Sequence, residues 1–366
     1  SGLAADTRYY YRIRHQDEWL MPAAQWFVTA PLPGQDRPLR AWVLGDPGKY
    51  AAKIPVRDAA LAWLQGNMRD ALPYADLLLS TGDQAYPNAS TAQLQREFFT
   101  PYQAVLQNIP VWPVLGNHDA RRWAHYRLFD SPQSGELGGV ASHDKGYFAF
   151  DYAQTHFVIL DSHDADTSQG APMLRWLEQD LAQTRQKWIV VLFHHPPYTR
   201  GTHDSDNPRD SRGRMQRARE NIAPILDRYG VDLVMSGHSH VYERSHLIHC
   251  HYGTSDSFAE WMIKDAGMLQ NSTRVYRKAE ATARDYSGTL YMVLGSSGEG
   301  NRGPFDHPAL PIASDQPGSL VLDIVDDTLH ARYITASGEI GDAFRIEKSA
   351  QAGVAVERNS CEPARN

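Results

Sequence analysis

Asp, Asn, His and Tyr residues follow five separate apolar runs in this chain, and these side chains offer the oxygen and nitrogen atoms that bind metal ions. The candidates are Asp46, Asp83, Tyr86, Asn117, His194, His238 and His240. A carboxylate can bridge two metals, and a tyrosine phenolate strongly favours a trivalent, oxygen-loving ion such as Fe(III). Two metals about 3.5–4 Å apart clamp a phosphoryl group, activate a hydroxide and stabilise the leaving oxygen. The residue set therefore predicts a two-metal phosphatase.

Each candidate lies just beyond the end of a predicted buried strand. The runs are AWVL, DLLLSTG, VWPVLG, WIVVLF and DLVMSG. Ligands of open α/β sheets bind at the carboxyl ends of such strands, so we expect the candidate side chains to converge. In Gly237-His238-Ser239-His240, residues i and i+2 of an extended segment point the same way. We therefore expect both imidazoles to face one cluster, one for each metal.

Helical spacing between the runs predicts that strands alternate with crossover helices from about residue 38 to 245. The apolar residues with this spacing are Leu61, Leu64 and Met68; Leu174, Leu177 and Leu181; and Ile222, Ile225, Leu226 and Tyr229. Residues 147–161 predict a hairpin of two further strands. The predicted fold class is α/β, a two-sheet sandwich preceded by a short β segment.

The segments outside this region give weaker patterns. Residues 1–30 alternate apolar and polar positions, which predicts two antiparallel strands. Residues 246–287 are polar and aperiodic, and a connection of this length is usually functional or irregular. Residues 289–295 and 319–347 are expected to be short strands that complete a second sheet.

Composition excludes some classes of function. The net charge of −7 leaves no footprint of basic residues for nucleic acid. No apolar stretch approaches the roughly 20 residues of a membrane span. The first residues lack the apolar core of a signal peptide, so any such peptide has been removed or was never present. Cys250 and Cys361 either form the disulfide of an exported protein or remain two buried thiols, which leaves the compartment open.

Five short motifs follow one another along the chain. They are Asp46-Pro47-Gly48, Gly82-Asp83-Gln84-Ala85-Tyr86, Gly116-Asn117-His118-Asp119, Val191-Leu192-Phe193-His194 and Gly237-His238-Ser239-His240. In this order they resemble the purple acid phosphatases, a family of the calcineurin-like metallophosphoesterase superfamily. Tyr86 is the most specific element, because most relatives in the wider superfamily lack a tyrosine at that place. Asp119 stands where glutamate is common, a departure that should leave metal binding intact.

The resemblance implies a role for each candidate. Fe(III) would be bound by Asp46, Tyr86 and His240, a divalent Zn, Mn or Fe by Asn117, His194 and His238, and both metals by the bridging Asp83. His118 would contact the substrate phosphate or protonate the leaving group, unless it only supports the metal ligands. His203 is either a second substrate histidine or a solvated loop residue. His195 is either a packing residue or, if the strand register slips by one, the true ligand.

The resemblance also implies a domain organisation and an activity. Residues 1–33 would be the last strands of a fibronectin-type-III-like domain, 38–348 an α/β/β/α catalytic domain and 349–366 a tail. The implied activity is hydrolysis of small-molecule phosphate monoesters by a metal-bound hydroxide, in a secreted or periplasmic acid phosphatase. Three alternatives stay open: a metallophosphoesterase acting on phosphodiesters, phospholipid headgroups or nucleotides; a catalytically silent binding protein; and a manganese-only or zinc-only enzyme without the Tyr86 ligand.

Overall fold

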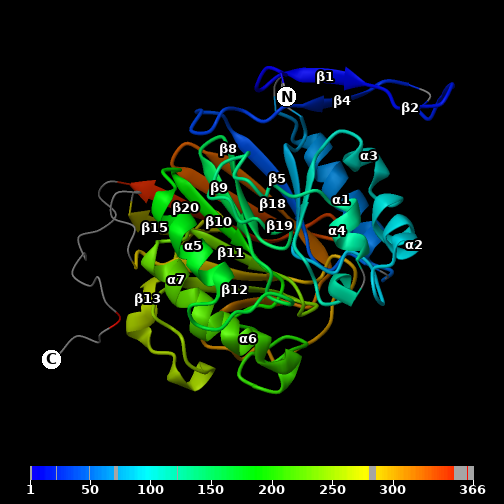
Figure 1. The fold of residues 1–366 in the computed structure, drawn as a ribbon. Coiled ribbons are helices and arrows are strands. Elements are labelled where there is room, and N and C mark those ends of the chain that lie inside the picture. Colours follow the sequence, from blue (N-terminus) through cyan, green and yellow to red (C-terminus); the bar gives the residue numbers. More distant parts are fainter. Residues whose placement is uncertain are drawn as a thin grey trace.

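Two large mixed β-sheets lie face to face between layers of helices (Figure 1). The structure, a computed structural model, describes residues 2–21, 23–48, 50–69, 73–121, 123–279, 286–349 and 361. The first sheet contains β8 (Phe148–Tyr152), β9 (Thr155–Ile159), β10 (Trp188–Leu192), β11 (Leu233–Ser236), β12 (Tyr242–Ile248), β13 (Ile263–Asp265), β16 (Thr289–Leu294) and β17 (Ile312–Ser314). Its order is β13-β12-β16-β11-β10-β9-β8, and β17 also pairs with β12.

The second sheet combines strands from residues 39–113 with strands from residues 268–349. It contains β5 (Leu39–Leu44), β6 (Leu77–Ser80), β7 (Val111–Pro113), β14 (Met268–Gln270), β15 (Thr273–Ala279), β18 (Gly318–Val325), β19 (Thr328–Thr335) and β20 (Ile340–Ser349). Its order is β14-β15-β20-β19-β18-β5-β6-β7. The strands β5, β6 and β7 are parallel to one another, as are β9, β10 and β11 in the first sheet.

Of the strands that precede the candidate residues, β5, β6, β10 and β11 are buried throughout, whereas β7 is partly exposed. In β5, Ala41 and Val43 face the core between the sheets, whereas Trp42 and Leu44 face the helices. The strand β10 alternates in the same way, because successive side chains of a strand point to opposite faces. Coverage of both faces explains why these strands are continuous apolar runs in the sequence.

Helices cover the outer face of each sheet. Against the second sheet lie α1 (Lys53–Gly66), α2 (Thr91–Leu94), η1 (Gln95–Phe99), α3 (Gln103–Leu106) and α4 (Ala124–Leu128). Against the first sheet lie α5 (Pro172–Gln183), η4 (Ala218–Ile222) and α7 (Ala223–Arg228), and α6 (Arg214–Arg217) leads into η4. Short helical turns are η2 (Asp119–Arg121), η3 (Asp210–Gly213), η5 (Ser255–Ser257) and η6 (Glu260–Met262). The predicted α/β sandwich is confirmed, and none of the helices in these described segments is long and apolar enough to cross a membrane.

The predicted helical stripes agree with the structure in most positions. Leu174, Leu177 and Leu181 are buried on α5. On α1 the buried stripe contains Leu64, but Met68 lies beyond the end of the helix and is exposed. The helix therefore ends at Gly66, two residues before the last apolar position of the predicted stripe.

Two expectations about the C-terminal half were wrong. Residues 289–295 were assigned to the second sheet, but β16 lies in the first sheet between β11 and β12. All six residues of β16 are buried, as in a central parallel strand covered on both faces. Residues 246–287 were expected to be functional or irregular, and the irregular alternative is wrong, because their described part contains β13, β14 and β15, of which β15 pairs in parallel with β20. Residues 319–347 do complete the second sheet as predicted.

The N-terminal residues form the predicted antiparallel pair, β1 (Arg8–Tyr11) and β4 (Gln25–Val28). Between them lies a small hairpin of β2 (Arg14–His15) and β3 (Glu18–Trp19) that the sequence pattern did not predict. The pair of β1 and β4 lies across one end of the molecule (Figure 1). It contacts the main body there, since the Tyr11 hydroxyl donates to the Gln107 carbonyl at 2.7 Å. The relation of residues 1–33 to a fibronectin-type-III-like domain stays a prediction. Of the expected tail, 349–366, only residues 349 and 361 are described.

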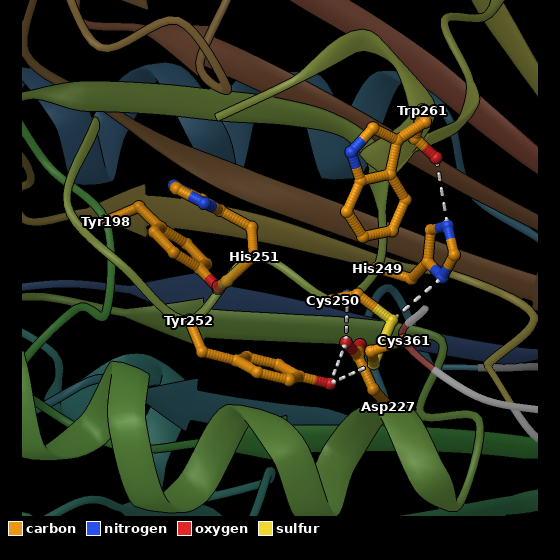
Figure 2. Close-up of a disulfide and its surroundings, with 8 residues drawn as sticks. All are labelled: Tyr198, Asp227, His249, Cys250, His251, Tyr252, Trp261 and Cys361. Carbon is orange, nitrogen blue, oxygen red and sulfur yellow. Dashed lines mark hydrogen bonds between the residues drawn. A yellow bond between two sulfur atoms is a disulfide. The ribbon is translucent and has the colours of Figure 1, made fainter. Parts of the chain in front are cut away.

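Cys250 and Cys361 form a disulfide, which resolves the two alternatives left by the sequence (Figure 2). Cys250 follows the end of β12, and the Cα atoms of the two cysteines are 5.4 Å apart. The buried Asp227 accepts the backbone N–H of Cys250 at 2.7 Å and the hydroxyl of Tyr252 at 2.9 Å. The disulfide therefore joins Cys361 to the end of the first sheet at which β12 finishes.

Candidate metal centre

The structure brings all seven candidate metal ligands together, and they come from both sheets. Asp46, Asp83, Tyr86 and Asn117 follow β5, β6 and β7 of the second sheet; His194 follows β10 of the first sheet, and His238 and His240 lie between β11 and β12. Several of them offer ligand atoms that lie within 4.8 Å of one another, as in the group of Asp46, Asp83 and His194. The predicted convergence at the strand ends is confirmed.

One group of donors consists of Asn117, His194 and His238. The amide oxygen Oδ1 of Asn117 is 3.0 Å from Nε2 of His194 and 2.9 Å from Nδ1 of His238. Nδ1 of His194 donates to the carbonyl of Thr81 at 2.9 Å, so its proton is on Nδ1 and its Nε2 carries a lone pair. The atoms that face one another here are hydrogen-bond acceptors, and a cation between them would satisfy all three.

A second group of donors consists of Asp46, Tyr86 and His240. The hydroxyl oxygen of Tyr86 is 3.3 Å from Oδ1 of Asp46 and 3.1 Å from Nε2 of His240. Nε2 of His240 is 3.6 Å from Oδ1 of Asp46. A carboxylate, a phenol and an imidazole thus converge on a single point, and this is an oxygen-rich donor set of the kind that hard cations prefer.

Asp83 lies between the two groups. Its Oδ2 is 3.6 Å from Nε2 of His194 in the first group, and its carboxylate raises the pKa of Tyr86 in the second. Its other oxygen, Oδ1, accepts the backbone N–H of His118 at 2.8 Å. Asp83 is therefore the residue whose position suits a bridge between two metals.

The electrostatics of the site also suit bound cations. Burial raises the pKa of the Tyr86 hydroxyl well above its usual value, and the carboxylates of Asp46 and Asp83 raise it further. Burial also raises the pKa of Asp46. Burial and the neighbouring histidines hold the pKa of His238 well below its usual value, so this imidazole is neutral. His238 is thus a neutral donor, and the buried oxygens of Asp46 and Tyr86 need a nearby cation to be ionised, so the donor set fits a pair of metal ions.

Unusual backbone conformations position these side chains. Asp46, Asp83 and His238 have φ angles of 53°, 54° and 67°, which is the left-handed region that few non-glycine residues adopt. A Cβ atom at Gly116 would lie 2.1 Å from Oδ1 of Asp83. Strained residues persist where the surrounding structure fixes them, and here they aim three candidate ligands into one place.

Asp119 supports the site in a way that the sequence did not indicate. Its fully buried carboxylate accepts the backbone N–H of Asp83 at 2.7 Å and that of Gly116 at 3.0 Å through Oδ2. It also accepts the N–H of Gln84 at 3.2 Å through Oδ1. One carboxylate thus ties together the loops that follow β6 and β7, which explains why a shorter acid at this position leaves the metal ligands in place.

The two candidate catalytic histidines lie beside different candidate ligands, the ring of His118 against that of Tyr86 and the ring of His203 against that of His238. The ring of His118 donates from Nδ1 to the carbonyl of Pro87 at 2.7 Å, and its Nε2 is 3.9 Å from Oδ2 of Asp83. The ring of His203 is stacked on that of His238, with centroids 4.0 Å apart. Nδ1 of His203 bonds to Oδ1 of Asp210 at 2.9 Å, so this histidine is held by the protein and is not simply a solvated loop residue.

His195 is buried beside the candidate ligands. Its Nδ1 is 2.9 Å from Oγ of Ser162, and its ring centroid is 4.5 Å from that of His238. His194, His195 and His238 could also hold an ion between them, so the alternative of a His195 ligand is geometrically possible. His194 and not His195, however, faces Asn117 of the other sheet, with its Nε2 3.0 Å from the Asn117 amide oxygen.

Comparison with known protein families places this geometry in context. The sequence model described as Calcineurin-like phosphoesterase matches residues 39–242, which is more than half of the 366-residue chain. The protein named "Probable inactive purple acid phosphatase 24" from Arabidopsis thaliana is 24% identical over 97% of this chain and 58% of its own length. "Purple acid phosphatase 1" from Ipomoea batatas is 28% identical over 67% of this chain and 50% of its own length. The chain spans about half the length of the curated relatives it matches.

Solved structures show the same fold. The purple acid phosphatase PPD1 from seeds of yellow lupin (Lupinus luteus) matches with a TM-score of 0.73 at 19% identity, covering 100% of this chain and 64% of that one. A structure of PhoD matches with a TM-score of 0.60 at 14% identity, covering 95% of this chain and 77% of that one. At these identities the comparison concerns the fold alone.

Proposed function

Because this chain belongs to the calcineurin-like phosphoesterase family, we propose that it is an acid phosphatase of the purple type that hydrolyses phosphate monoesters at a binuclear metal centre. The observation that carries the proposal is the position of the Tyr86 hydroxyl, 3.3 Å from Asp46 and 3.1 Å from His240. A tyrosine oxygen in this place distinguishes an iron-binding site from a site for two divalent ions.

Each half of the site would hold one metal. Asp46, Tyr86 and His240 would bind Fe(III); Asn117, His194 and His238 would bind a divalent Zn, Mn or Fe ion; and Asp83 would bridge the two. When bound, the metals would supply Lewis acidity that lowers the pKa of water and neutralises charge on the phosphoryl oxygens. The iron half has the anionic oxygen donors and the other half has neutral donors, which matches a trivalent and a divalent ion.

The histidines of the chain would handle the substrate. His118 donates from Nδ1 to the Pro87 carbonyl, so its Nε2 is the atom available to the substrate. Protonated at Nε2, His118 would donate to a phosphate oxygen or give its proton to the leaving group. Nδ1 of His203 is held by Asp210, which leaves Nε2 of that ring to contact an anionic substrate.

The test is a visible absorption spectrum of the purified protein together with its content of iron, zinc and manganese. We expect a tyrosinate-to-iron charge-transfer band that Tyr86→Phe abolishes. Tyr50→Phe is the matched control, because the Tyr50 ring lies 5.3 Å from that of Tyr86 on the rim of the site. A colourless protein that holds two metals and cleaves phosphate esters would remove the iron assignment and favour the manganese-only or zinc-only enzyme.

A comparison of substrates tests the remaining part of the proposal. We expect faster turnover of 4-nitrophenyl phosphate than of bis(4-nitrophenyl) phosphate. A clear preference for the diester would contradict the proposed monoesterase activity. It would favour a phosphodiesterase, phospholipase or nucleotide-specific enzyme with the same metal site. A metal-loaded protein without turnover of either ester would favour a silent binding protein, an outcome that the name of one relative, "Probable inactive purple acid phosphatase 24", makes worth testing.

We also propose that the protein works in an oxidising compartment, secreted or periplasmic. The disulfide between Cys250 and Cys361 supports this, because disulfides persist in oxidising environments and are rare in the reducing cytosol. A thiol assay on denatured protein from the native source, before and after reduction, tests the pairing.

A further inference from the structure

The loop that carries η3 contains a serine and an aspartate that contact the candidate divalent-metal half of the site. We infer that Ser211 and Asp210 are positioning residues that hold the proton of His238 on Nε2 and so present Nδ1 to the metal. This inference rests on the proposed metal centre, and it concerns a contact that neither the motifs nor the predicted ligand set includes.

The proton positions follow from the hydrogen bonds. Asp210 accepts from Nδ1 of His203 at 2.9 Å, from the N–H of Asp204 at 3.0 Å and from Oγ of Ser211 at 2.8 Å, as expected for an ionised, acceptor-only carboxylate. Ser211 has a single hydroxyl proton, and this bond uses it. Oγ of Ser211 lies 2.6 Å from Nε2 of His238, so here Oγ must accept and Nε2 must carry the proton.

The consequence appears on the other side of the ring. With its proton on Nε2, His238 has a lone pair on Nδ1, which faces Oδ1 of Asn117 at 2.9 Å. The carbonyl of Thr81 fixes the ring of His194 in the same sense, since it can only accept the Nδ1 proton. Outer hydrogen bonds of this kind orient metal-binding imidazoles and raise their basicity. The hydrogen bonds from Asp210 through Ser211 thus fix the tautomer of His238, as the carbonyl of Thr81 fixes the tautomer of His194.

The same carboxylate oxygen also fixes the second histidine. Oδ1 of Asp210 accepts from both Ser211 and His203, and the His203 ring lies on the His238 ring at an interplanar angle of 17°. The position of a predicted substrate histidine and the tautomer of a predicted metal ligand therefore depend on one atom.

The backbone at Ser211 is strained, which argues for a constraint at this residue. Ser211 and Arg212 have φ angles of 50° and 57°, both in the left-handed region. Non-glycine residues persist in this region where the surrounding structure fixes them, and they cluster at functional sites. Glycine would relieve the strain at Ser211 but would lack the hydroxyl.

This strain gives a test that separates positioning from folding. Ser211→Gly and Ser211→Ala both remove the hydroxyl, and the glycine variant also relieves the backbone. The matched control is Arg212→Gly, which relieves the neighbouring left-handed residue and leaves the hydrogen bonds of Ser211 intact. Zn²⁺ affinities of the metal-free proteins are measured by competition with a chelator. We expect both Ser211 variants to lose about 10- to 100-fold in affinity at one of the two sites, with Arg212→Gly unchanged.

The tautomer of His238 is measured by NMR of the metal-free proteins labelled with ¹⁵N-histidine. The signals of His238 are assigned by their loss in His238→Gln. We expect the proton of His238 on Nε2 in the wild type and in Arg212→Gly, and a mixture of tautomers in Ser211→Gly. Unchanged Zn²⁺ affinity in both Ser211 variants, or a wild-type His238 with its proton on Nδ1, would overturn the inference. If the wild-type protein binds no Zn²⁺, the proposed function is wrong. The tautomer of His238 then remains as the test of whether Ser211 fixes the position of its proton.

Discussion

The amide oxygen of Asn117 lies 3.0 Å from Nε2 of His194, although Asn117 follows a strand of one sheet and His194 follows a strand of the other. The candidate metal centre is therefore also a junction between the two sheets. Because the donors on both sides are turned toward one point, a cation bound there would hold the sheets together at this end. Metal binding and stability are thus expected to be linked.

Removal of His194 tests this link. A ligand that binds only the folded state adds about 2.7 kcal/mol of stability at a free concentration 100 times its dissociation constant. We expect Zn²⁺ to raise the melting temperature of the metal-free wild type and to do so less in His194→Ala. The control is His15→Ala, an exposed histidine on β2 that should keep the full shift. An equal shift in His194→Ala would mean that the ion binds elsewhere.

His118 is expected to affect poor leaving groups most. A general acid typically contributes 10²–10⁴-fold to the rate, and its contribution is largest where the departing oxygen must be protonated. We expect His118→Asn to lower kcat for an alkyl phosphate by about 100-fold or more, and to lower kcat for 4-nitrophenyl phosphate much less. Equal losses for both esters, seen mainly in KM, would instead indicate that His118 only binds the phosphate.

A buried histidine far from the motifs gives a prediction about pH. His156 on β9 lies between two carboxylates, with Nδ1 2.7 Å from Asp151 and Nε2 2.7 Å from Asp180. Burial opposes its charge, but these two bonds outweigh burial and raise the pKa of His156 to about 9. A raised pKa stabilises the fold below the unfolded value near 6.5, and this contribution is lost as the pH rises through about 9.

Chemical denaturation at pH 7 and pH 10 measures this contribution. We expect His156→Gln to destabilise the protein by roughly 2–3 kcal/mol more at pH 7 than at pH 10. His125→Gln is the control, because burial lowers the pKa of His125 to about 3 and it is neutral at both pH values. A His156→Gln penalty that does not vary with pH would show that His156 is uncharged in the folded state.

The disulfide is expected to contribute to stability and not to the metal site. Cys250 and Cys361 are separated by 111 positions, and loss of such a bond costs about 2–5 kcal/mol. The seven residues of β12, about 23 Å in length, separate Cys250 from His240. We expect Cys361→Ser to lower the urea midpoint and to leave Zn²⁺ affinity unchanged. Cys250→Ser and the double variant should show the same loss, and additive losses would indicate that the cysteines act separately.

The sequence was most informative where the chemistry is local. The apolar runs that became β5, β6, β10 and β11 could be recognised because a strand covered on both faces excludes polar residues throughout. The sequence also placed His238 and His240 in one cluster, but the reason it offered, an extended segment, was wrong, because His238 has a left-handed φ of 67° and the segment turns tightly there. By contrast, β16 was assigned to the wrong sheet, since its apolar composition shows burial but not which strand lies beside it.

What the sequence alone determined is therefore the set of donor residues, their places at strand ends and the α/β class. Only the tertiary structure decided that Asp119 ties two loops together, that Cys250 pairs with Cys361 and that Ser211 contacts His238. The physical reason is that strand formation and ligand chemistry depend on neighbouring residues. A hydrogen bond between residues 27 positions apart depends instead on how the intervening chain folds, and no local pattern records it.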